Sequence, residues 1–290
     1  MYLMLMEKYT MLIIDYNGIA IGNIVSQKLN IDENLIRHMI LNTIRMYRQK
    51  FKKYAEDTII VSDGGGNWRK ELYPEYKANR KKSRDESSMD WDEVFRITNL
   101  VFDEIKENMP YKVLKIWGCE ADDTIAQIVY DTQEFGNHTD VMIISADKDF
   151  IQLHTLGNVS QFSPVTKKLV KNESPADYFK FHILNGDNGD GVPNVLSDDK
   201  VLVEGRRQNT LSAKRKESLL VDPKSMGEEV YRNYLRNKKM IDLSECPSGV
   251  IDKIMKEYKS QDPWHKKGKV FPYFVSKKCV NLLEKVQEFL

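Results

Sequence analysis

The sequence has little of what many catalytic and structural sites require. Its three cysteines lie far apart and form no C-x-x-C pair, and its five histidines show no H-E-x-x-H spacing. These absences argue against a disulfide framework and a zinc ribbon, and they suit a reducing cytoplasm. A G-x-x-x-x-G-K-[ST] loop is also missing, which excludes a Walker-type nucleotidase.

Long apolar runs are absent too. No stretch approaches the roughly 20 residues of a membrane-spanning helix, and the mean hydropathy is −0.52. The first residues, MYLMLMEKY, lack a basic leader, so we expect neither a signal peptide nor membrane attachment. The chain has 290 residues, of which 41% are hydrophobic and 30% charged, and its net charge is +1. These values predict one or two folded, soluble domains.

Short apolar strands alternate with amphipathic helices over the first 160 residues. Strands are expected at 10–15, 58–63, 111–117 and 140–145, and helices are expected to begin after Asp32, Asp90 and Gly118. This alternation predicts an α/β fold with a mainly parallel central sheet flanked by helices, and 159–171 predicts an appended hairpin. We place an α/β domain at 1–185 and a helical, basic domain at 186–290.

Nine acidic residues are predicted to converge at one edge of this sheet. Asp15, Asp63 and Asp147 each end a predicted parallel strand, and open α/β sheets bind ligands at that carboxyl edge. The remaining acids follow a strand or share a glycine-rich turn: Glu120, Asp122, Asp123, Asp149, Asp187 and Asp190. Taken singly, each has a plain structural role in a turn or at a helix N-terminus. It is the joint pattern that predicts a site.

Such a cluster needs a counter-charge, because carboxylates packed together repel one another. Oxygen ligands without histidine or cysteine favour Mg²⁺ or Mn²⁺ over zinc. Two such ions would activate a phosphodiester for hydrolysis. With the acids neutralised, the rest of the chain is basic, which indicates a polyanionic substrate.

A segment from Trp68 to Arg80 interleaves aromatic rings with cations. Rings can stack on unpaired bases while lysine and arginine contact phosphates. On a helix beginning near Pro74, Lys77 and Arg80 would share a face and address one phosphate. The alternative is an exposed basic helix with structural tyrosines. The nucleic-acid-binding candidates in this region are Arg69, Tyr73, Tyr76, Lys77, Arg80 and Lys81.

Taken in order, these motifs resemble those of the flap endonuclease / 5′-nuclease family. They are Asp15, Asp63, the Tyr-Pro-x-Tyr-Lys-x-x-Arg segment, Glu120-Ala-Asp-Asp123, Ser145-Ala-Asp-Lys-Asp149 and Gly186-Asp-x-x-Asp190. More closely, the chain resembles the phage ribonuclease H branch of that family. The features shared with that branch are Asp90-Trp91, Met109-Pro-Tyr111, Ser163-Pro164 and Tyr273-Phe-Val275.

The resemblance implies a PIN-like nuclease fold, a helical arch over about 69–92 and a C-terminal helix–three-turn–helix that grips duplex DNA. One cation would be held by Asp15, Asp63, Glu120, Asp122 and Asp147. A second would be held by Asp149, Asp187 and Asp190. The residues that the resemblance implies to be catalytic are Lys77, Arg80 and Asp122. Lys77 and Arg80 match residues of the family's arch that contact the scissile phosphate.

The activity implied is that of a metal-dependent 5′→3′ exonuclease and flap endonuclease with two Mg²⁺ ions, Mn²⁺ being the alternative. It would remove RNA primers from RNA–DNA hybrids, and adjacent DNA, during lagging-strand replication. The implied partners are a DNA flap or fork, a single-stranded-DNA-binding protein and a sliding clamp. We expect a monomer in the cytoplasm of a phage-infected bacterial cell.

The sequence departs from the family after Asp190, where a glycine-rich G-I-G-x-K-x-A hairpin is missing. Side-chain contacts to the duplex are expected instead from Arg206, Arg207, Lys214 and Arg215. Two rival functions stay open. A non-catalytic, structure-selective DNA-binding protein would have lost ligands, yet all nine acids are present. A magnesium phosphohydrolase of small phosphoesters usually has D-x-D after its first strand, and here Asp15 is followed by Tyr16 and Asn17.

Overall fold

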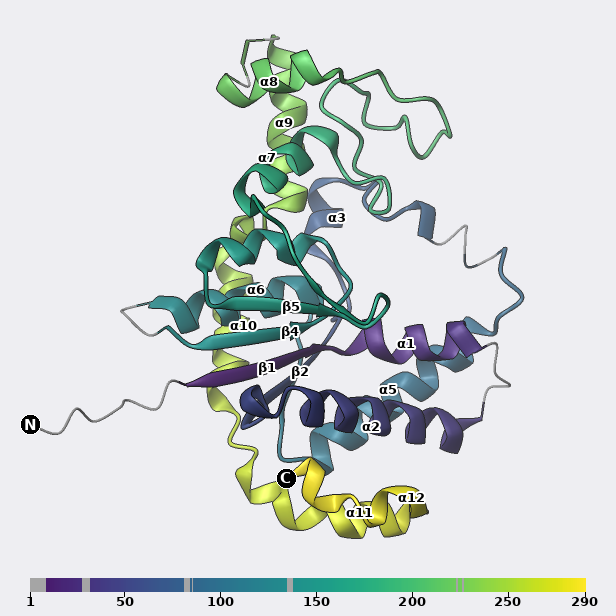
Figure 1. Ribbon diagram of the computed structural model, residues 1–290. Coiled ribbons are helices and arrows are strands. Elements are labelled where there is room, and N and C mark those ends of the chain that lie inside the picture. The colour runs from purple at the N-terminus through teal and green to yellow at the C-terminus, as the bar shows by residue number, and fades with distance from the viewer. Residues whose placement is uncertain are drawn as a thin grey trace, which may run out of the picture.

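A computed structural model describes residues 9–27, 32–80, 84, 86–134, 138–222, 224–225 and 227–290. These residues contain a six-stranded sheet with the strand order β3-β2-β1-β4-β5-β6 (Figure 1). The strands are β1 (Thr10–Asp15), β2 (Asp57–Ser62), β3 (Lys112–Lys115), β4 (Asp140–Ile144), β5 (Val159–Ser163) and β6 (Lys168–Val170). Strands β1 to β5 pair in parallel and β6 is antiparallel to β5. The prediction of a mainly parallel sheet is confirmed.

The central strands are buried on both faces, which explains their continuous apolar sequences. In β1, Leu12 and Ile14 belong to the hydrophobic core on one face, while Met11 and Ile13 belong to the core on the other. Successive strand residues point to opposite faces, so an unbroken apolar run fits a sheet covered by helices on both sides.

Helices cover both faces of the sheet (Figure 1). One face carries α1 (Tyr16–Gln27), α2 (Glu33–Lys50), α5 (Trp91–Asn108), α11 (Val270–Ser276) and α12 (Val280–Leu283). The other carries α6 (Ala121–Gln133) and α10 (Ser248–Ser260). As predicted, Asp32 and Asp90 cap α2 and α5, because their carboxylates accept from backbone N–H groups three residues ahead.

The remaining helices stand above the sheet in the view of Figure 1. They are α3 (Trp68–Leu72), α7 (Pro175–Asn185), α8 (Ala213–Val221) and α9 (Glu228–Ile241). No helix among the described residues is both long and apolar enough to cross a membrane.

The C-terminal third of the chain completes the cores of the sheet. Phe274 and Phe289 are fully buried in the same hydrophobic cluster as Phe102 of α5. The hydroxyl of Tyr111 donates a hydrogen bond of 2.9 Å to the carbonyl of Phe289. Each of the two hydrophobic cores therefore contains residues from both sides of position 185. The domain boundary placed there stays a prediction.

Candidate metal centre

A first set of carboxylates meets at the carboxyl edge of the sheet. Its members are Asp15 at the end of β1, Asp63 after β2, Glu120 and Asp122 at the start of α6, and Asp147 after β4. One hydrogen bond ties two of these elements together, because the backbone N–H of Ala121 donates to Asp63 Oδ1 over 2.9 Å. The parallel register of β1, β2 and β4 brings these segments to one edge, as the sequence predicted.

The pKa values of these groups record how closely they are packed. Burial raises the pKa of Asp15 to about 6, and the negative charges of Asp63 and Asp147 add to that effect. Burial also raises the pKa of Asp122 well above its ordinary value, with Asp147 the next largest cause. Buried carboxylates that resist ionisation beside one another are a strong attractor for a cation.

Polar neighbours that sequence reasoning missed orient two of these carboxylates. The hydroxyl of Ser145 donates to Asp15 Oδ2 over 2.8 Å. The side-chain amide of Asn17 donates to Asp63 Oδ2 over 2.7 Å, and its carbonyl accepts from Ser62 Oγ over 2.8 Å. The signal was available, since Asn17 lies two residues beyond a strand-ending aspartate.

A second set of groups adjoins the first and includes a histidine. Nδ1 of His182 lies 3.5 Å from Asp149 Oδ1, and its Nε2 lies 3.3 Å from Asp187 Oδ2. Donor atoms of these three residues all lie within 4.8 Å of one another. The backbone N–H of Asp190 donates to Asp187 Oδ1 over 3.1 Å, which draws the Gly-Asp turn into the set.

The two carboxyl groups of this second set that contact His182 have pKa values shifted in opposite directions. Burial, followed by the charge of Asp147, raises the pKa of Asp149 to about 8. The hydrogen bond from His182 lowers the pKa of Asp187 to about 2. Oδ1 of Asp149 is buried and has no hydrogen-bond partner within the described part of the chain. The donor atoms present therefore fit a divalent cation.

His182 was not among the predicted site residues. It lies in the last turn of α7, one turn before the Gly-Asp turn that carries Asp187 and Asp190. That position, at the end of a helix that leads directly into the acidic turn, is the sequence signal that could have identified it.

Lys77 and Arg80 both reach the acidic edge, but not from the predicted helix. Residues 74–78 form turns, and Lys77 has a left-handed φ of 56°. A helix beginning at Pro74 was therefore a wrong prediction. Nζ of Lys77 contacts Glu120 and lies 3.4 Å from Asp190 Oδ2, while Nη2 of Arg80 lies 2.6 Å from Asp190 Oδ1.

The two tyrosines predicted to stack on bases are buried instead. The Tyr76 hydroxyl donates to Glu120 Oε2 over 2.7 Å and lies 3.0 Å from Asp190 Oδ2. The Tyr73 hydroxyl contacts the carbonyl oxygens of Gly191 and Asp199 at 3.3 and 2.6 Å. Neither ring is accessible to a nucleobase, so their assignment as nucleic-acid contacts is corrected. The Tyr76 hydroxyl instead contacts two carboxylates of the acidic edge, Glu120 and Asp190.

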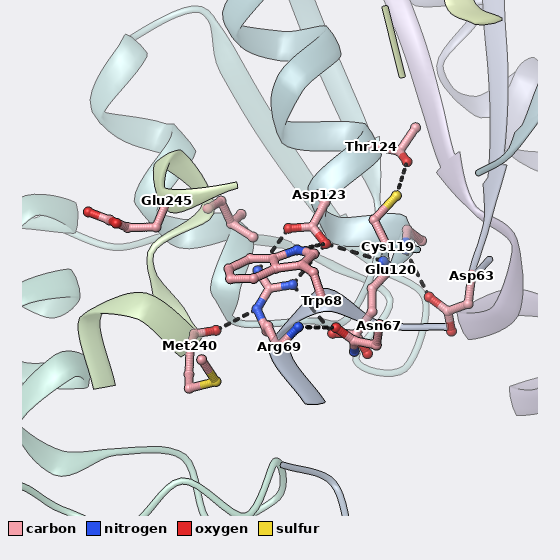
Figure 2. Close-up of polar contacts among 12 residues, drawn as sticks. Asp63, Asn67, Trp68, Arg69, Cys119, Glu120, Asp123, Thr124, Met240 and Glu245 are labelled. Atoms are coloured by element: carbon pink, nitrogen blue, oxygen red, sulfur yellow. Dashed lines mark hydrogen bonds and ion pairs between the residues drawn. The ribbon is translucent and has the colours of Figure 1, made fainter. Parts of the chain in front are cut away.

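Asp123 and Arg69 form a buried ion pair rather than parts of the site (Figure 2). Nη1 and Nη2 of Arg69 donate to the two carboxylate oxygens of Asp123, each over 2.8 Å, and Nε donates to the Met240 carbonyl. The indole N–H of Trp68 also donates to Asp123. Because both side chains are buried and fully engaged, we correct the assignment of Asp123 as a metal ligand and of Arg69 as a nucleic-acid contact.

The other basic candidates stay predictions. Four of them are exposed: Arg206 and Arg207 lie in the loop before α8, and Lys214 and Arg215 lie in the first turn of α8. Arg206 also pairs with Asp198 at 2.9 Å and Glu204 at 2.6 Å. Lys81 and part of the arch predicted over 69–92 lie outside the described residues.

Two family models match the chain. The model of the 5′-3′ exonuclease N-terminal resolvase-like domain matches residues 10–179, and that of the T4 RNase H C-terminal domain matches residues 174–289. The chain belongs to the 5′-3′ exonuclease family. The predicted family and hydrolase class of this nuclease are confirmed.

Relatives and solved structures support this assignment. The nuclease is 33% identical to Ribonuclease H of Enterobacteria phage T4 over 96% of this chain and 95% of the relative. It is 29% identical to a 5′-3′ exonuclease of Buchnera aphidicola over 54% of this chain and 53% of that relative. The T5 D15 protein co-crystallised with metal ions shares the fold with a TM-score of 0.63, at 20% identity, over 86% of this chain and 98% of that chain.

Proposed function

We propose that this nuclease is a divalent-cation-dependent 5′→3′ exonuclease and flap endonuclease. Its substrates would be DNA flaps or forks and RNA–DNA hybrids, from which it would remove RNA primers and adjacent DNA in lagging-strand replication. The observation that carries the proposal is the meeting of carboxylates from the ends of β1, β2 and β4 and from the start of α6 beside Lys77 and Arg80. Carboxylates can bind the metal ions that hydrolyse a phosphodiester, and the neighbouring Lys77 and Arg80 can bind the phosphate itself.

Two Mg²⁺ ions, with Mn²⁺ as the alternative, would fit the two sets of donors. The first ion would be held by Asp15, Asp63, Asp122 and Asp147, with Glu120 at its border. The second would be held by Asp149, Asp187, Asp190 and, as a nitrogen donor, His182. When bound, such ions supply Lewis acidity and neutralise charge on the phosphodiester. A separate nucleophilic side chain is not required.

Lys77 and Arg80 would bind and orient the scissile phosphate. The carboxylates of Glu120 and Asp190 raise the pKa of Lys77 above its ordinary value, although burial opposes them, so its ammonium stays charged. With cations bound to Glu120 and Asp190, both basic side chains would become available to a phosphate. They would then neutralise charge as it develops on the reacting group.

The biological setting is part of the same proposal. The T4 relative, named a ribonuclease H, spans nearly the whole chain, and a DNA polymerase I of Streptococcus pneumoniae matches 66% of it. A solved T5 D15 complex holds DNA and metal ions. These names support a DNA substrate in a phage-infected bacterium. A single-stranded-DNA-binding protein and a sliding clamp are proposed partners of a monomeric enzyme.

Cleavage of a 5′-labelled flap with and without Mg²⁺ tests the proposal, with product length as the readout. We expect Asp122→Asn and Asp149→Asn to abolish cleavage while duplex binding changes by only a few-fold. Asp103→Asn, an exposed position of α5 outside the predicted arch, is the matched control and should cleave normally. Turnover by the wild type in EDTA would contradict the metal mechanism. Hydrolysis of a small phosphoester but not of the flap would support the phosphohydrolase instead.

A further inference from the structure

Trp117 is a large aromatic side chain left exposed beside the candidate metal centre. It is 73% exposed, whereas Trp68, Tyr73 and Tyr76, the rings expected from the sequence to meet bases, are buried. Trp117 lies three residues before Glu120, so their Cα atoms are within about 11 Å of each other. An exposed indole at this position calls for an explanation, since folding gains little from leaving it in water.

The indole is seated on a glycine loop. A Cβ added at Gly65 would lie 2.0 Å from Cζ3 of Trp117, and one added at Gly66 would lie 3.3 Å from its Cε2. Glycine is therefore required beneath both parts of the ring system. Because the glycines cover one side of the indole and most of its surface is still exposed, its other side faces solvent.

Backbone hydrogen bonds hold this seat rigidly. The N–H of Gly118 donates to the carbonyl of Gly65 over 2.7 Å, and the N–H of Gly64 donates to the carbonyl of Cys119 over 3.2 Å. The paired loops lead directly into the centre, because Asp63 precedes Gly64 and Glu120 follows Cys119. The backbone that carries the indole is thus held next to two carboxylates of the site.

We propose that Trp117 is a stacking platform for an unpaired nucleobase of the substrate. The proposal rests on the proposed function, since it names a subsite of the same centre. An exposed indole seated on glycines offers a flat π-face that accepts any base, and loss of such a stack weakens binding about fivefold to a hundredfold. The platform would hold a single-stranded nucleotide close to the carboxylates without reading its sequence.

Binding measured in EDTA tests the platform independently of cleavage. The probes are a blunt duplex and the same duplex with a 5′ oligothymidine extension, both followed by fluorescence anisotropy. Trp117→Ala should weaken binding of the extended duplex about tenfold and leave the blunt duplex unchanged. Trp117→Tyr should restore most of the loss. Gly65→Ala, which displaces the ring, should reproduce it.

A matched control comes from Trp264, which is 48% exposed and lines a hollow with Thr10 and Asp57, the residues that begin β1 and β2. It lies at the opposite edge of the sheet, so Trp264→Ala should bind both probes normally. An abasic position moved along the extension locates the base. At the position that stacks on Trp117, removal of the base should weaken binding by the wild type. The same removal should not weaken binding by Trp117→Ala any further, because that variant has already lost the stack.

Equal binding of the extended duplex by Trp117→Ala and wild type would overturn the platform, as would an equal loss on both probes or additive losses at every abasic position. These outcomes are separable from failure of the proposed function. A protein that binds in this pattern but never cleaves a flap in Mg²⁺ would refute the nuclease mechanism and keep the platform. A protein that cleaves the flap in Mg²⁺ but shows no selective loss of binding in Trp117→Ala would keep the nuclease mechanism and refute the platform.

Discussion

Lys77 and Glu120 form an ion pair that joins the segment after α3 to the N-cap residue of α6. Both side chains are largely buried. Burial opposes ionisation of Glu120, but Lys77, Arg69 and the Tyr76 hydroxyl together hold its pKa below its ordinary value. The pair places a permanent positive charge at the border of the acidic edge. A phosphate entering the site would meet that charge already in position.

Lys77→Ala should lower the single-turnover cleavage rate by about 10²–10³, by analogy with the loss of one transition-state donor. The measurement is the rate on a 5′ flap at saturating enzyme, so that weaker binding does not contribute. Lys52→Ala, an exposed lysine between α2 and β2, is the control and should cleave at the wild-type rate. An unchanged rate for Lys77→Ala would show that this ammonium does not serve the reaction.

His182→Ala should change which ion the second site prefers. Imidazole suits transition ions such as Mn²⁺ better than Mg²⁺, so its removal should weaken Mn²⁺ binding about tenfold and Mg²⁺ binding less. Calorimetric titration of each ion without substrate measures this directly. His138→Ala, an exposed histidine between α6 and β4, serves as the control. Equal losses for both ions would mean that the imidazole only braces Asp149 and Asp187.

Asp123→Ala should destabilise the protein by about 3–5 kcal/mol, because it leaves the buried Arg69 guanidinium without its partner. Urea unfolding followed by circular dichroism gives the free energy of unfolding. The matched control is Glu93→Ala, which breaks an exposed pair with Arg96 and should leave that free energy unchanged. The double variant Asp123→Leu with Arg69→Met should recover much of the loss. A wild-type stability for Asp123→Ala would restore this residue as a candidate ligand.

Glu104 makes part of the stability depend on pH. Burial opposes ionisation of this carboxylate, but hydrogen bonds from Arg37, Lys277 and Tyr273 prevail, and its pKa is lowered from 4.5. The native state therefore binds fewer protons than the unfolded chain in acid. The contribution is complete above pH 4.5 and is lost as the pH falls through the lower native value.

Glu104→Gln should accordingly lower the free energy of unfolding by about 2 kcal/mol near neutral pH and by much less in acid. Urea unfolding at several pH values measures the difference between the two proteins. Glu107→Gln, an exposed glutamate one turn further along α5, should give a curve that matches the wild type. A constant difference at all pH values would show that shape, and not charge, explains the effect.

The layout of the fold could be predicted because local signals and topology agree. Asp32 and Asp90 mark the helix starts, and the apolar runs mark the strands. Once the strands are parallel, geometry alone brings Asp15, Asp63 and Asp147 to one edge. No further information is needed to expect a cation there.

Side-chain partners could not be predicted in the same way. Nothing near Arg69 in the sequence reveals that its guanidinium forms an ion pair with Asp123, 54 residues away. Equally, the left-handed backbone of Lys77 follows from its N–H donating to the Asp190 carbonyl over 2.7 Å, a tertiary contact. Trp117 was overlooked because exposure of an aromatic residue cannot be read from its neighbours in the sequence.

The burial of Phe289 against Phe274 of α11 has a consequence for synthesis in the cell. Strand β1 is made first, yet the core on its face is complete only when this phenylalanine has left the ribosome. A nascent chain that is still tethered exposes an unfinished apolar surface and holds its carboxylates on an unsettled scaffold. We therefore expect little cleavage from a chain in which the segment around Phe289 has not yet folded into this core.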